Sequence, residues 1–156
     1  MKKAVARLSI IFATLAASLF IAPAAHAGAY GCGGSEIDTY AVKTNGGSVY
    51  GYIHLYYDSS TGVNCAVNVA NSAGGYGTPT FKMVYMNRCV AGTSAGGGCT
   101  VDVERQDPPF GSSTKYSYYG GPVSFNAAGR CLLIGGTIVS PSGGVASYAS
   151  KATHCG

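Results

Sequence analysis

Alternation of apolar and aromatic residues is strongest between residues 48 and 57. Two sets of alternate positions can be separated there: Val49, Gly51, Ile53, Leu55 and Tyr57 against Tyr50, Tyr52, His54 and Tyr56. Successive side chains of a strand point to opposite faces. The pattern therefore predicts a strand with one face toward a core and an aromatic face on the other side.

Similar short stretches recur along the chain between turn residues such as Asn-Gly and Pro-Ser-Gly. We predict nine strands, at residues 36–43, 48–57, 63–70, 80–86, 100–104, 115–119, 122–126, 131–140 and 144–150. No segment after residue 27 shows a helical period, and the links are hairpin-like in length. The fold class expected is all-β: a single small antiparallel β-sandwich or barrel of about 8–9 short strands.

Residues 1–27 have the composition of an export signal. Lys2, Lys3 and Arg7 precede a mostly apolar stretch, and Ala25-His26-Ala27 places small residues where a signal peptidase cleaves. The apolar stretch of fifteen residues, 8–22, is shorter than the roughly 20 that a membrane-spanning helix needs. We expect cleavage after Ala27, a secreted β-domain at residues 28–156 and no stable membrane anchor.

Charge is nearly balanced once the signal is removed. Seven basic residues then face six acidic ones, so the net charge is about +1, and the cations are scattered along the chain. Nucleic-acid binding relies on clustered Lys and Arg side chains, so nucleic acid is not an expected partner. All 24 glycines and 12 tyrosines lie beyond the signal, a composition that favours short strands and tight turns.

Six cysteines remain in the expected mature chain: Cys32, Cys65, Cys89, Cys99, Cys131 and Cys155. In an exported protein they are expected to form three disulfides. Cys89 and Cys99 flank a flexible run of small residues and are predicted to pair. The strand layout places Cys32 with Cys65 and Cys131 with Cys155, because each pair shares one end of a predicted hairpin or meander. The pairing Cys32–Cys155 with Cys65–Cys131 stays open as an alternative.

Two explanations fit the tyrosine-bearing side of residues 48–57. Tyr50, Tyr52, His54 and Tyr56 would offer a platform for a sugar ring or a partner protein, because Tyr combines a flat apolar face with a polar tip. They are our candidate ligand-binding residues. The ordinary explanation is that Tyr is favourable in strands, or that this face packs beneath another part of the molecule, and we favour it.

Metal-binding motifs are absent from the sequence after residue 27, and candidate catalytic residues are few. Only His54 and His154 remain there, without a His-x-x-x-His or Cys-x-x-Cys pattern. Asp102, Glu104 and Asp107 form one acidic cluster, but Arg105 lies among them, and calcium requires six or more converging oxygens. We predict a solvated strand end there, no catalytic residue, no metal site and no cofactor.

Two stretches carry a family resemblance. Residues 48–69 and 118–138, together with Gly31-Cys32-Gly33 and the final Cys155-Gly156, resemble spore-associated protein A of spore-forming filamentous actinobacteria. The resemblance covers most of residues 28–156. The departure is the segment at about 88–109, which carries Cys89 and Cys99 and looks like an insertion loop.

The resemblance implies a small exported protein on the spore surface or in the medium, without enzymatic activity. Our first hypothesis is therefore a non-catalytic protein, secreted or at the spore or cell surface, whose partner is spore-surface or cell-wall material or a secreted protein. The alternative is a secreted binding module or hydrolase inhibitor that uses the tyrosine-rich strand or the loop between Cys89 and Cys99. The third hypothesis is an enzyme of a type that the sequence does not identify.

Overall fold

The computed structural model describes residues 28–156, and the expected signal at residues 1–27 lies outside the described residues. Eight strands form: β1 (Ser35–Lys43), β2 (Val49–Asp58), β3 (Val63–Ala70), β4 (Lys82–Cys89), β5 (Val101–Asp107), β6 (Tyr119–Asn126), β7 (Leu132–Val139) and β8 (Val145–Ala149). The described residues contain no helix, and hence none that is long and apolar enough to cross a membrane. The predicted all-β class is confirmed.

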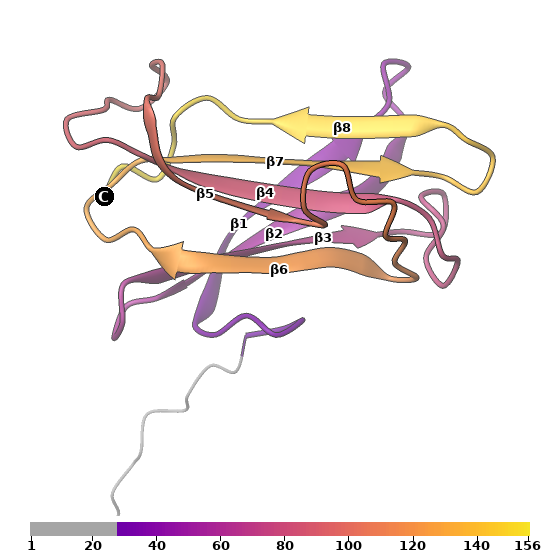
Figure 1. Cartoon of the computed structure of the whole chain (residues 1–156), viewed down its shortest axis with the longest axis horizontal. Helices are drawn as coiled ribbons and strands as arrows, with labels where there is room; N and C mark the ends of the chain where they lie inside the picture. Colours follow the sequence, from indigo (N-terminus) through magenta and orange to yellow (C-terminus); the bar gives the residue numbers. More distant parts are fainter. Residues whose placement is uncertain (1–27) are drawn as a thin grey trace, which may run out of the picture.

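All strand pairs are antiparallel, in the order β5-β4-β7-β8-β1-β2-β3-β6. The two ends of this order, β5 and β6, pack side by side without sharing a ladder (Figure 1). The sheet is therefore a nearly closed barrel with one seam, between β6 on one side and β4 and β5 on the other. We call this contact the β5–β6 seam.

Apolar side chains on the inward face of the strands fill the barrel. The fully buried members are Val42, Ile53, Leu55, Ala66, Val84, Met86, Leu132, Ile134 and Ile138. Their positions alternate along each strand, as the period of two requires. One polar side chain crosses this core: Asn68 Nδ2 donates to the backbone oxygens of Met83 at 2.8 Å and Thr137 at 3.3 Å. The core thus ties β3 to the opposite wall of β4 and β7.

The strand predicted at residues 115–119 is wrong. Tyr116 makes one isolated bridge, whereas β6 begins at Tyr119 and continues through two glycines and Pro122. Proline lacks the N–H that a ladder uses, and so it is tolerated in a strand that pairs on one side only. Because β6 pairs with β3 alone, Pro122 interrupts no second ladder. Gly120 and Gly121 mark a close approach of β6 to β4, and not a turn, because an added methyl group would overlap the backbone oxygen of Lys82 or the Val84 side chain.

Three disulfides form, and they are the pairs favoured from the sequence: Cys32–Cys65, Cys89–Cys99 and Cys131–Cys155. The alternative pairing of the outer four cysteines does not occur. The first bond ties the segment before β1 to β3. The second closes the loop between β4 and β5, and the third holds the chain beyond β8 against the start of β7.

Candidate binding surfaces

The tyrosine-bearing side of β2 is only partly exposed. Ile53 and Leu55 point into the barrel, which turns Tyr52, His54 and Tyr56 to the outside of the sheet. Tyr52 is 41% exposed, whereas Tyr56 is 4% exposed. Tyr52 and Tyr56 therefore both point outward, but Tyr52 is exposed to solvent whereas Tyr56 is buried.

Tyr50 leaves this row altogether. The ladder between β1 and β2 shifts register between Val42 and Lys43, and Tyr50 has no partner on β1. An extra residue of this kind interrupts the alternation of side chains. Tyr50 packs against the main core, and a methyl group on Gly144 would overlap its hydroxyl. The structure brings together three of the four candidate residues and places the fourth at the end of the barrel.

The segment that precedes β1 covers part of the same face. The Tyr30 ring lies 5.9 Å from the His54 ring, and the disulfide of Cys32 with Cys65 is buried beside Tyr56 in a small apolar cluster. Packing by this segment explains why Tyr56 is buried although it points away from the barrel interior.

His54 is engaged in a contact across the β1–β2 ladder. Its Nδ1 lies 2.9 Å from Glu36 Oε1, and the same oxygen accepts a hydrogen bond from the Thr39 hydroxyl. These two bonds, that of Thr39 first, lower the pKa of Glu36 below its ordinary value. The carboxylate therefore stays ionised and holds the imidazole against β1.

A second histidine contact was not anticipated from the sequence. Tyr40 Oη lies 2.7 Å from His154 Nε2, and Asp38 Oδ2 lies 3.3 Å from that same nitrogen. A catalytic histidine relay uses the two ring nitrogens separately, and this arrangement uses one. Burial, with the nearby Asp38 carboxylate, raises the pKa of Tyr40, so its hydroxyl remains protonated. The contacts of His154 with Tyr40 and Asp38 hold the segment after β8 against β1.

The loop at residues 90–98 is exposed but anchored. Apart from Thr93, each of its residues is exposed, and the Cys89–Cys99 disulfide closes its base. Midway along the loop, the backbone N–H of Gly96 donates to the backbone oxygen of Ala152 at 2.7 Å. The loop carries small residues without charge, so it presents mainly backbone to solvent.

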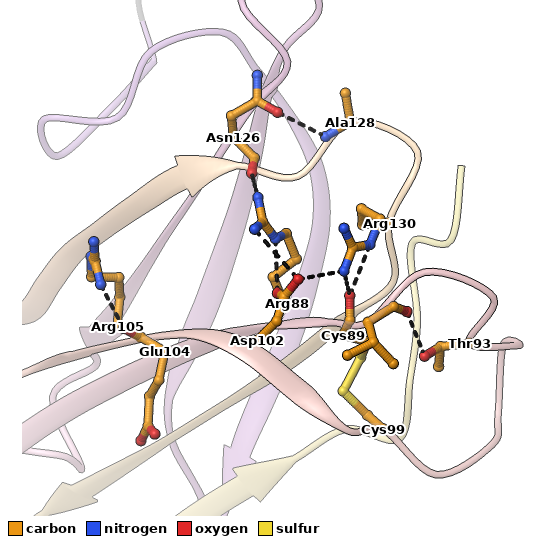
Figure 2. Close-up of polar contacts among 11 residues, drawn as sticks. Arg88, Cys89, Thr93, Cys99, Asp102, Glu104, Arg105, Asn126, Ala128 and Arg130 are labelled. Carbon is orange, nitrogen blue, oxygen red and sulfur yellow. Dashed lines mark hydrogen bonds and ion pairs between the residues drawn. A yellow bond between two sulfur atoms is a disulfide. The ribbon is translucent and has the colours of Figure 1, made fainter.

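Asp102 joins the elements at one end of the seam (Figure 2). It is the extra residue where the β4–β5 ladder shifts register, and its carboxylate accepts hydrogen bonds from Arg88 Nε at 2.9 Å and from Arg130 Nη2. Arg88 also donates to the backbone oxygen of Asn126 at the end of β6, at 2.9 Å. The Arg88 bond first, and then Arg130, lower the pKa of Asp102. Side chains close the seam here, where no ladder does.

The other end of the seam is closed in a similar way. Asp107 accepts hydrogen bonds from the Tyr116 hydroxyl at 2.9 Å and from the backbone N–H of Gly121 at 2.7 Å. Burial, together with Asp107, raises the pKa of Tyr116 to about 12. Lys82 is fully buried nearby and donates to three oxygens, one of them the backbone oxygen of Tyr116. Burial lowers the pKa of Lys82.

The three carboxylates of the acidic cluster do not converge. Asp102 and Asp107 are held in the seam, while Glu104 lies on the opposite, outer side of β5 and points away from Asp102 (Figure 2). Within residues 28–156, no group of three or more His, Cys, Asp or Glu side chains is placed to hold a metal ion.

A protein of Streptomyces coelicolor is similar to part of this chain. Over 88 residues the chain is 32% identical to Spore-associated protein A of Streptomyces coelicolor (strain ATCC BAA-471 / A3(2) / M145). The match supports a relationship between the two proteins. It covers 56% of this chain and 46% of that protein, so the chain spans less than half the length of its relative.

Two further comparisons gave no match. No protein-family model matches the chain, and no solved structure matches it. The similarity to Spore-associated protein A and the three disulfides are together consistent with an extracellular or cell-surface location.

Sequence reasoning missed the contacts that join distant segments. Tyr40 and His154 are 114 residues apart, and no local pattern relates them. Asp102 was grouped with its acidic neighbours in sequence, although its partners Arg88 and Arg130 come from other elements. The signal available was weak, because Asp102 lies near the start of a short strand while Arg88 and Arg130 are 14 and 28 residues away in sequence.

Proposed function

We propose that this chain is a non-catalytic protein that acts outside the cell, at the surface of the spore or of the cell. The similarity to Spore-associated protein A is the observation that carries the proposal. The three disulfides support it, because such bonds form and persist in oxidising compartments outside the cytoplasm.

The state of the polar side chains also supports a role without catalysis. His54 is bound to Glu36, and His154 is bound to Tyr40. Lys82 is buried with three oxygen partners within 3.0 Å. A general base or nucleophile has to reach a substrate atom within hydrogen-bonding distance. These groups are instead committed to contacts inside the fold.

Fractionation of the producing organism tests the location. A tagged full-length chain should be recovered from the medium and from washed spores or cell envelopes, with a larger share on the washed surfaces than an unrelated secreted β-protein of similar size. A purified protein without turnover on panels of glycoside, ester and peptide substrates is also expected. Retention of the tagged chain inside the cell, or measurable turnover, would contradict the proposal.

The loop at residues 90–98 favours a second candidate function, a secreted inhibitor or binding module. The loop is exposed, yet it is anchored by the Cys89–Cys99 disulfide and by the bond from Gly96 to Ala152. A contact segment that is already ordered loses less conformational entropy when it binds. This is the physical requirement for a small protein that inhibits an enzyme by presenting a loop.

A panel of secreted hydrolases tests this candidate. Inhibition by the wild-type protein should be lost in Ala95→Asp, which places a charge in the exposed loop. The matched control is Ser59→Asp in the exposed turn between β2 and β3, which should inhibit like wild type. Absence of inhibition across the panel, or equal inhibition by Ala95→Asp, would exclude the loop as an inhibitory surface.

A further inference from the structure

The outer face of β4 forms the floor of a groove of about 530 Å³. Phe81, Met83, Tyr85 and Asn87 lie along the floor at alternate positions. At about 3.3 Å per strand residue, this row is roughly 20 Å long. The walls come from the outer sides of β5 and β7 and from the loop that follows β5. We call this site the β4 groove; it is larger than the cavity of about 180 Å³ near His154.

Three aromatic rings line the β4 groove, those of Phe81, Tyr85 and Phe110. Phe110, in the loop after β5, is 97% exposed. The Tyr85 ring lies over Gly135 of β7, where even a methyl group would overlap it. A glycine at this position lets the ring lie along the sheet as part of the floor. An almost fully exposed Phe beside such a ring offers apolar surface that gains free energy when a ligand covers it.

Backbone pairing in the floor limits the kind of ligand that fits. β4 is paired with β5 on one side and with β7 on the other, so the ladder bonds of β4 are already used. An extended peptide gains affinity by adding a strand to a free sheet edge, and the floor provides none. A ligand here must bind through side chains, that is, through ring faces and polar groups.

Two side chains of the β4 groove carry acceptor oxygens without partners, whereas the Gln106 amide and the Ser112 hydroxyl are already hydrogen-bonded. Asn87 Oδ1 is buried and has no hydrogen-bond partner among the described residues. Within the same residues, the Glu104 carboxylate makes no hydrogen bond or ion pair. No Lys or Arg lines the groove, so nothing there would neutralise an anionic ligand. Hydroxyl groups, which donate hydrogen bonds, complement these acceptors.

We propose that the β4 groove binds an uncharged carbohydrate chain. A sugar ring matches both features of the lining, with an apolar face of C–H groups for Phe110 and Tyr85 and hydroxyl donors for the Glu104 carboxylate. The inference rests on the proposed function, which is a location at the surface of the spore or cell. It deepens that proposal by naming a neutral glycan of this surface as the bound material.

Binding measurements with soluble, uncharged oligosaccharides of glucose and of N-acetylglucosamine test the proposal directly. We expect the full mature protein to bind at least one of them. Phe110→Ala should weaken binding roughly 2-fold to 10-fold, the usual range for loss of one aromatic contact. Because Phe110 is 97% exposed, this variant should fold like wild type. Tyr76→Ala, which removes an exposed ring from the loop between β3 and β4, outside the groove, is the matched control and should bind like wild type.

Three results would overturn the proposal. They are the absence of binding to every neutral glycan tested, undiminished binding by Phe110→Ala, and tighter binding to an acidic polysaccharide such as alginate than to any neutral one. Fractionation separates this failure from that of the proposed function. If the wild-type chain remains on washed spores while glycan binding is absent, the surface role stands and the carbohydrate inference falls.

Discussion

Two outer faces of the barrel carry aromatic side chains, and they differ in what covers them. On β2, the segment before β1 packs over the sheet, and Tyr56 is reduced to 4% exposure. On β4, the outward side chains of Met83, Tyr85 and Asn87 are partly buried and line the β4 groove, and Phe110 stands 97% exposed at its wall. An aromatic row in the sequence therefore identifies an outward face, but the path of a distant segment decides whether that face is core or surface.

The two faces should differ most in how much an aromatic ring contributes to the free energy of unfolding. Tyr56→Ala removes a buried ring and should lower the free energy of unfolding by about 3–5 kcal/mol, as for other large-to-small aromatic changes in cores. Tyr85→Ala removes a half-buried ring from the β4 groove and should cost clearly less. Chemical denaturation of both variants measures the difference. Equal losses would mean that the two faces are packed alike.

The disulfide beneath the covering segment should have the next largest effect. Replacing Cys32 and Cys65 by Ser opens a loop of 33 residues and should cost about 2–4 kcal/mol in the free energy of unfolding. The matched control replaces Cys89 and Cys99, which close a shorter loop with a separation of 10 residues and lie away from β2. Hydrogen exchange should show loss of protection along β2 in the first variant only. Unchanged exchange there would show that the segment covers the face without this bond.

A smaller effect is expected in acid at the seam that supports the β5 wall of the β4 groove. Hydrogen bonds from Arg88 and then Arg130 lower the pKa of Asp102 in the folded state. A lowered folded pKa gives stability that is present above the ordinary carboxyl pKa of about 3.9 and is lost as the pH falls toward the folded value. Asp102→Asn should therefore melt at lower temperature at neutral pH, and its melting point should fall less steeply in acid.

The control for this experiment is Glu104→Gln, which alters a carboxylate of the same strand that makes no hydrogen bond within the described residues. Its melting temperature should follow the wild-type pH profile. If Asp102→Asn also follows that profile, the contact of Asp102 with Arg88 and Arg130 contributes nothing to the closure of the seam.

Local patterns in the sequence were sufficient for most of the fold. Alternation along β2 and the turn residues between strands predicted the hairpins, and the hairpins in turn placed Cys131 beside Cys155. These features depend on neighbours in sequence. The strand at residues 115–119 was wrong because Gly-Gly-Pro resembles a turn, whereas in β6 it serves an edge strand close to β4.

The candidate binding surfaces were harder to predict from the sequence, because they depend on contacts between distant segments. The burial of Tyr56 depends on a segment tied to β3, and the displacement of Tyr50 depends on a bulge opposite β1. The β4 groove combines residues of β4, β5, β7 and a loop, including Gly135, whose missing side chain makes room for Tyr85. Such sites arise from contacts across the barrel, which a single strand pattern does not contain. Whether Tyr50, Tyr52, His54 and Tyr56 bind a ligand stays a prediction.

Hydroxyl-radical footprinting of the mature protein, free and bound to washed spores, tests most directly which face does the binding. In the free protein, Phe110 and Tyr52 should both be oxidised, because both are exposed, and Tyr56 should be protected. On spores, we predict that oxidation of Phe110 and Met83 decreases strongly while that of Tyr52 is unchanged. Protection of Tyr52 with undiminished oxidation of Phe110 would contradict the account and assign binding to the β2 face.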